Sequence, residues 1–217
     1  GQETAVERQS LLSAPLIQRC LGNGHFTLAD YIAFLTEAFH HVSHTVPLLM
    51  AVGSRLPASK ESFRVAVAEY IEEEIGHQEW ILNDLAACGV DPETIRHGKP
   101  NIATELMVAY AYDTVMRRNP MGFFGMVFVL EGTSINLATQ AAEIIQRRLQ
   151  LPTKAFSYLR SHGSLDIEHM AFFEKLMNTV EDPQDRDDIV HAARRFFRLY
   201  GDIFRSIDIA QQPALAA

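Results

Sequence analysis

The segment MGFFGMVFVLEGTS, residues 121–134, carries no charge for ten residues and then a single acid, Glu131. Apolar residues continue beyond it at three- and four-residue spacing as far as Leu151, where Pro152 follows. The run is far too long for a β-strand, so it predicts a buried helix. A lone carboxylate in such a helix binds a proton or needs a cation, because desolvation disfavours its charged form. Glu131 is therefore a candidate functional residue, although a carboxylate that only caps or bridges helices fits the same pattern.

The helical spacing extends over most of the chain, and Gly and Pro residues separate its segments. We expect bends near Pro15 and before Pro47, a short turn or helical segment from Asp91, and a frayed tail over residues 210–217. The expected helices cover about residues 4–21, 27–56, 59–88, 102–118, 121–151, 153–180 and 189–209. These elements predict one all-α domain over residues 1–217, an antiparallel bundle of about seven helices with functional groups projecting inward.

Composition narrows the class of partner. The chain has 217 residues, 47% of them hydrophobic, and a formal net charge of −8. An acidic chain is poorly suited to nucleic acid or to an anionic membrane, so we expect neither as a partner. The longest uninterrupted apolar stretch is too short to span a bilayer, which predicts a soluble, cytoplasmic protein. Two cysteines cannot build a disulfide framework, whereas nine histidines invite a search for metal ligands.

Three candidate ligands share one stripe of the predicted helix 153–180. His162, Asp166 and His169 are spaced by four and then three residues, which places them on the same helical face. Apolar neighbours such as Phe173 indicate that this face looks into the core, where uncoordinated polar groups are costly. Two histidines satisfied by backbone carbonyls, with the Asp bridging to Arg160, are the plainer interpretation.

A second pair, Glu74 and His77, is separated by three residues within the predicted helix 59–88. This is the arrangement by which bundle proteins with two metal ions present a carboxylate and an imidazole. The segment around Glu74 is rich in acids, so a solvated acidic face explains the spacing equally well. His77 is more informative, because apolar residues accompany it on its side of the helix.

The candidates together provide three carboxylates and three imidazoles. That inventory suits two iron or manganese ions, because carboxylates can bridge two metals while imidazoles complete each one. Zinc accepts the same donors, although a structural zinc site favours four ligands, often cysteines. The candidate metal ligands are Glu74, His77, Glu131, His162, Asp166 and His169.

The order Glu-x-x-His, lone Glu, His-x-x-x-Asp-x-x-His resembles the heme-oxygenase-like diiron oxidases, relatives of the thiaminase II (TenA) and pyrroloquinoline-quinone synthase (PqqC) proteins. The similarity covers about residues 27–209. It implies a heme-oxygenase-like bundle with two iron ions, the second labile, that activates dioxygen to oxidise a small organic substrate. It also implies an electron donor and a homodimer.

This chain departs from the family pattern in the helix that carries His77. Some family members place the carboxylate seven residues before the His, where this chain has Tyr70. Glu73 is the fallback for Glu74, and Glu37 is the inward candidate for a further carboxylate. Tyr70 is also a candidate catalytic residue, as an oxidisable phenol near the metals.

The pocket beside the metals should suit an apolar or aromatic ligand. His40 and His44 share a helical face and can line it, although packing or surface histidines are the more common reading of such a pair. The expected pocket residues are Phe34, Glu37, Ala38, His40, His44, Phe124, Val127 and Phe173.

Other functions stay open at this point. A metal-free hydrolase like thiaminase II needs a nucleophilic cysteine in the pocket, and neither Cys20 nor Cys88 lies in the helix where the family's nucleophile is expected. An oxidase like the quinone synthase works without a metal, and heme binding through one histidine fits a site with six polar ligands poorly. A non-catalytic helical module that dimerises is the remaining alternative, and it would bury acids without metals at a cost in stability.

Overall fold

The computed structural model describes residues 2–22 and 24–210, and their side chains except those of residues 163–169 and 208–210. Over this part of the chain it contains helices and no β-strand, which confirms the all-α prediction. The α-helices are α1 (Ala5–Leu12), α2 (Pro15–Leu21), α3 (Leu28–Val42), α4 (Thr45–Arg55), α5 (Glu61–Glu74), α6 (His77–Ala87), α7 (Pro92–Arg96), α8 (Ile102–Arg117), α9 (Phe123–Leu149), α10 (Ser157–Met177) and α11 (Pro183–Ala210). Four short 3-10 helices join them: Gln2–Thr4, Ala58–Lys60, Pro120–Gly122 and Thr153–Ala155.

Three of the seven predicted helices are each broken into two. The first breaks before Pro15, as expected. The second breaks at Ser43 and His44, before Pro47 as expected, and Pro47 lies in the first turn of α4, where a missing N–H is tolerated. The third breaks at Gly76, whose φ of +92° is the left-handed conformation that glycine adopts without strain. The expectation of one continuous helix over residues 59–88 was therefore wrong.

The last helix begins earlier than predicted. α11 starts at Pro183, not near residue 189. The Asp182 side chain accepts a hydrogen bond of 2.9 Å from the Gln184 backbone N–H, and proline is favourable at a first helical position because it has no N–H to leave unpaired. Residues 183–188, which lie between the predicted helices 153–180 and 189–209, thus belong to α11.

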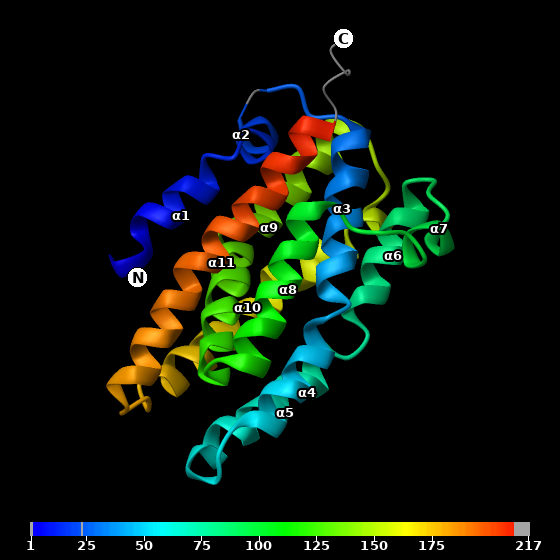
Figure 1. Cartoon of the computed structure of the whole chain (residues 1–217). Helices are drawn as coiled ribbons and strands as arrows, with labels where there is room; N and C mark the ends of the chain where they lie inside the picture. The colour runs from blue at the N-terminus through cyan, green and yellow to red at the C-terminus, as the bar shows by residue number, and fades with distance from the viewer. Residues whose placement is uncertain (1, 23, 211–217) are drawn as a thin grey trace.

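The long helices α8, α9, α10 and α11 lie side by side, with α3 packed against α8 and α11, whereas α4 and α5 extend together beyond one end of the bundle (Figure 1). α9 packs against both α10 and α11. Gly125 permits this close approach, since a β-carbon there would lie 2.5 Å from the Ile189 carbonyl oxygen of α11. The polypeptide backbones of α9 and α11 therefore touch at this point.

Buried polar groups fix the helices that carry the candidate site. Asp84 of α6 is fully buried and accepts hydrogen bonds of 2.9 Å from the backbone N–H groups of Ser157 and Tyr158. It thereby caps the start of α10 from a neighbouring helix. The Tyr31 hydroxyl of α3 donates 2.7 Å to the carbonyl of Ala155, just before α10. The position of α10 is thus set by both α3 and α6.

Within the described residues, one helix, Pro120–Leu149, is long and apolar enough to cross a membrane, and half of its most apolar window is buried inside the molecule. This helix is α9 with the short 3-10 turn before it. It packs between α10 and α11, as the core helix of a soluble bundle does. The packing of this helix against α10 and α11 explains its apolar composition.

Candidate metal centre

The break at Gly76 brings an acid and a histidine together. Glu74 is the last residue of α5 and His77 is the first residue of α6. Both are buried, and the His77 Nδ1 lies 3.1 Å from the Glu74 Oε2. The sequence suggested that the two residues share the face of one continuous helix, and the structure shows that they do not. They meet because the chain changes direction between them.

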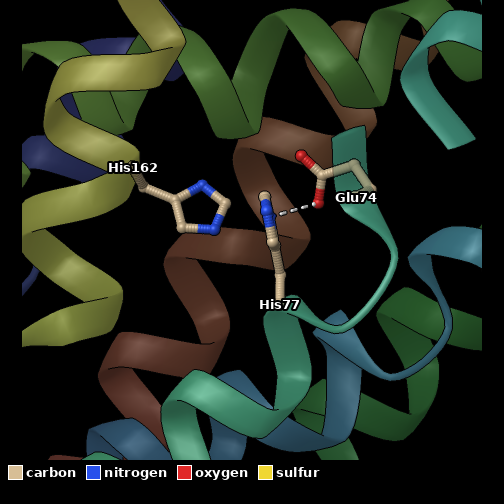
Figure 2. A group of neighbouring side chains, drawn as sticks. All are labelled: Glu74, His77 and His162. Atoms are coloured by element: carbon tan, nitrogen blue, oxygen red, sulfur yellow. Dashed lines mark ion pairs between the residues drawn. The ribbon is translucent and has the colours of Figure 1, made fainter. Parts of the chain in front are cut away.

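His162 of α10 completes a group of three. One ligand atom from each of Glu74, His77 and His162 lies within 4.8 Å of the other two. Figure 2 shows the His77 ring between the Glu74 carboxylate and the His162 ring, with the three side chains converging from separate segments. Donor atoms this close together from one carboxylate and two imidazoles form a candidate metal centre.

Aromatic side chains fix the two imidazoles. The Trp80 indole stacks on the His77 ring, with centroids 3.9 Å apart. The Tyr158 ring meets the His162 ring at 4.8 Å, and the two imidazoles meet nearly at right angles at 5.0 Å. Packed rings on each side restrict rotation of the histidines, so the ligand geometry is prepared before any ion binds.

A cavity of about 160 Å³ opens beside this group, and Glu74 and His162 contribute to its wall. Its lining is mostly aliphatic and aromatic and comes from helices at both ends of the sequence. Glu131 of α9 and Tyr70 of α5 line the same cavity. An apolar chamber with a few converging polar groups is the usual form of a small-molecule site.

The remaining predicted ligands divide into two groups. Glu131 reaches the cavity but not the close group of three donor atoms. Asp166 and His169 belong to α10, but their side chains lie outside the described residues. Glu73, the predicted fallback, is exposed, whereas Glu74 is 8% exposed and turned inward. Burial therefore favours Glu74 over its neighbour.

Of the predicted pocket residues, Phe34 and Val127 line the cavity. Glu37 does not, because its carboxylate accepts hydrogen bonds from the Asn101 backbone N–H and the Thr104 hydroxyl at the start of α8. This acid caps a helix, so the structure gives it no part in the metal group. Ala38 is also wrong as a pocket residue, since it is buried in the helix-packing core.

The other four predicted pocket residues face neighbouring elements. His40 lies against the loop at Gly98, and the His44 Nδ1 is 3.1 Å from the Tyr112 hydroxyl. Phe124 packs against the ring of a phenylalanine on α5 at 5.6 Å. Phe173 stacks on a phenylalanine of α9 and lines a separate cleft beside the N-terminal segment. Helix rotation explains three of these errors, because the cavity is lined by the neighbouring residues His41, Thr45 and Phe123, whereas Phe173 lies too far along α10 to reach it.

Sequence reasoning missed His41, which lines the cavity and is 3% exposed. Burial lowers the pKa of its imidazole to about 3, with a smaller contribution from nearby His162, so the ring is neutral at physiological pH. The sequence could have indicated this role, because His41 lies seven residues after Phe34 and therefore shares the helical face of that pocket residue.

Cys20 of α2 also lines the cavity. Burial raises the pKa of its thiol to about 11, and Arg148 offsets only part of this effect. The thiol is therefore protonated at neutral pH. The sequence of α2 did not indicate that Cys20 reaches the cavity, because this depends on how α2 packs against α9.

Comparison with known proteins identifies a matching family and shared folds. A model of the family described as iron-containing redox enzymes matches residues 32–201. No curated protein matches the sequence.

Solved structures share the fold along nearly the whole chain. A domain of unknown function with a heme oxygenase-like fold, from Shewanella denitrificans, has a TM-score of 0.87 and 25% identity, over 97% of this chain and 91% of that chain. A TenA homologue from Pseudomonas syringae has a TM-score of 0.78 and 12% identity, over 96% and 90%. The heme oxygenase of Leptospira interrogans has a TM-score of 0.67 and 15% identity, over 94% and 96%. The predicted heme-oxygenase-like bundle is confirmed.

Proposed function

Since this chain belongs to the family of iron-containing redox enzymes, we propose that it is a non-heme diiron oxidase or oxygenase that uses dioxygen to oxidise a small organic substrate. The observation that carries the proposal is the convergence of Glu74, His77 and His162 within 4.8 Å at the wall of an apolar cavity. A family of iron enzymes, a donor group and an adjoining chamber together support oxidation chemistry at this position.

The residues present fit iron. Carboxylate and imidazole donors suit ferrous and ferric ions, and manganese and zinc accept the same set. Glu74, His77 and His162 would hold one ion, and Glu131 would join Asp166 and His169 in holding a second, more labile one. A bound iron centre would supply redox chemistry with dioxygen, with electrons from an external donor.

The described side chains account for the rest of the site. Trp80 and Tyr158 hold the imidazoles in place, and the aliphatic wall excludes water from the substrate. Tyr70 is 2% exposed and lines the chamber one helical turn before Glu74, so we propose it as a phenol that takes part in the oxidation. A Tyr70→Phe variant should lose turnover while keeping its iron, and full turnover would remove Tyr70 from the mechanism.

A metal-free hydrolase is less well supported. Cys20 does line the cavity, but its raised pKa keeps the thiol protonated, whereas nucleophilic catalysis needs a thiolate. α9 offers no cysteine to the chamber. An oxidase that works without a metal would leave Glu74 and two histidines buried around no ion, which is an unfavourable use of buried polar groups.

The test is iron content and oxygen uptake after anaerobic loading with ferrous iron. We expect about two irons per chain in the wild type, and loss of oxygen uptake in His162→Ala and Glu131→Ala. His97→Ala is the matched control, because His97 lies in an exposed loop away from the cavity and should leave both values unchanged. Loading with manganese and zinc in parallel identifies the preferred metal. A wild-type chain that binds no iron at any loading contradicts the proposal.

A further inference from the structure

His41 has a hydrogen-bonding atom that the protein itself leaves unused. The side chain is 3% exposed and lines the cavity, and its Nδ1 is buried without a hydrogen-bond partner in the described structure. Buried polar groups in native proteins are nearly always paired, so an exception at a cavity wall points to a ligand that supplies the missing partner. His41 and His162 line the same cavity, so this atom lies in the wall of the chamber that adjoins the metal group.

Ser134 presents a second such atom from another helix, α9. Its Oγ is buried without a partner, and the residue lines the same cavity from α9, one turn after Leu130. A serine hydroxyl in a helix often bonds a carbonyl of the preceding turn, as Thr133 does here to Val129 at 2.6 Å. Ser134 makes no such bond, so its hydroxyl remains available to a ligand.

The charge of the wall limits what that ligand can be. Among the described lining residues there is no Lys or Arg, whereas Glu74 and Glu131 are both present. A free anion would find acids and no cationic side chain to pair with. The His41 Nδ1 donates or accepts one hydrogen bond according to the tautomer of the ring, and the Ser134 hydroxyl can do both, which matches a hydroxyl group on the ligand.

The shape of the wall adds a preference for aromatic rings. Aromatic side chains from several helices and from the loop before α3 surround the chamber: Phe26, Phe34, Tyr70, Phe123, Tyr158, Tyr200 and Phe204. Aromatic rings pack favourably against one another in offset or edge-on contacts. We propose that His41 and Ser134 hold the hydroxyl group of a neutral phenol inside this cavity. The identification of this phenol as the substrate rests on the proposed function. Its binding in the cavity does not depend on that function.

The experiment compares two ligands of equal shape, 4-ethylphenol and 1-ethyl-4-methylbenzene, in ligand-observed NMR titrations of iron-loaded and metal-free protein. We expect the wild type to bind the phenol about tenfold more tightly, which is the effect of roughly one net hydrogen bond. His41→Phe keeps the ring and its packing on Tyr200 but removes the polar atom, so the two affinities should come within about twofold. Ser134→Ala, a mild change that preserves the helix, should reduce the preference several-fold.

His40→Phe is the matched control. His40 neighbours His41 on α3 but faces the loop at Gly98, so its replacement should leave the tenfold preference intact. Equal binding of the two ligands by the wild type, binding of neither, or a preference that survives in both His41→Phe and Ser134→Ala overturns the proposal. The iron content of His41→Phe should match the wild type. Failure of iron loading in the wild type would reject the diiron function alone, because the phenol preference is also measured without metal.

Discussion

The His77 Nδ1 lies 3.1 Å from the Glu74 Oε2, although the two residues belong to different helices. Gly76 makes the contact by taking a φ of +92° between them. In a single straight helix, both side chains would extend from the same helix face toward the same neighbouring helix. With the break, the acid approaches from the end of α5 and the imidazole from the start of α6, so both reach the side of His162.

Replacing Gly76 should therefore disturb both stability and metal binding. A β-carbon at Gly76 meets no atom within 4 Å, so Gly76→Ala carries only backbone strain, about 1–2 kcal/mol of unfolding free energy. Gly89→Ala is the matched control, since Gly89 has a φ of +86° and equally open space at the far end of α6. We expect urea denaturation to show similar losses in both variants, and iron titration to show weaker binding only in Gly76→Ala. Equal iron affinity in the two variants would separate the break from the metal centre.

Gly125 and Gly132 of α9 should respond oppositely to alanine. A β-carbon at Gly125 would lie 2.5 Å from the Ile189 carbonyl oxygen and 2.7 Å from the Ala193 nitrogen, so α9 and α11 must separate. We expect a loss of about 1–3 kcal/mol or more for Gly125→Ala. Gly132 has open space around it in mid-helix, and Gly132→Ala should gain about 0.5–1 kcal/mol. Thermal unfolding of the pair measures both, and a stable Gly125→Ala would show that the helices are less closely packed.

Asp84→Ala should be more damaging than Asp91→Ala, although each removes an aspartate that caps a helix. Asp84 is fully buried and accepts two backbone N–H groups at the start of α10, which would be left unpaired out of reach of water. We expect a loss of about 2–4 kcal/mol from two such groups. Asp91 caps α7 at the surface, where water replaces the carboxylate, so its loss should cost about 1 kcal/mol or less. Equal unfolding free energies would contradict the dry environment assigned to Asp84.

His41 should make the fold sensitive to acid. Its folded-state pKa of about 3 lies below the ordinary value of 6.5, so only the unfolded chain takes up its proton between these values. Stability from this group is complete above about pH 6.5 and falls as the pH drops, by up to about 1.4 kcal/mol per pH unit. Urea denaturation of wild type and His41→Phe between pH 4 and 7 measures the difference. Parallel pH profiles would mean that His41 is solvated.

The long helices were predictable because they depend on local spacing, whereas the meeting of Glu74 and His77 depends on the break between α5 and α6. Apolar periodicity located the long helices, and the Glu-x-x-His and His-x-x-x-Asp-x-x-His patterns selected Glu74, His77 and His162. The break at Gly76 was missed, because an isolated glycine in a helical pattern is compatible with either a continuous or a broken helix.

The pocket was predicted less well, because its lining depends on helix rotation and on contacts between distant segments. His40 and His44 were chosen over His41, and the rotation of α3 that decides between them is set by packing against α6, α8 and α11. Cys20 reaches the cavity only because α2 lies against α9, more than one hundred residues later in the chain. The Asp182-Pro183 start of α11, by contrast, was visible in the sequence as a helix-start signal.

The protonated state of Cys20 bears on how the protein would withstand the oxidation chemistry that we propose. Oxidants convert cysteine to sulfenic and then irreversible higher acids by attack on the thiolate, and the proton on Cys20 withholds that form. Under the proposed function, the Cys20 sulfur is thereby protected from oxidation while it remains part of the cavity wall. The same burial that keeps Cys20 from acting as a nucleophile would preserve the lining of the cavity during the oxidation chemistry that we propose.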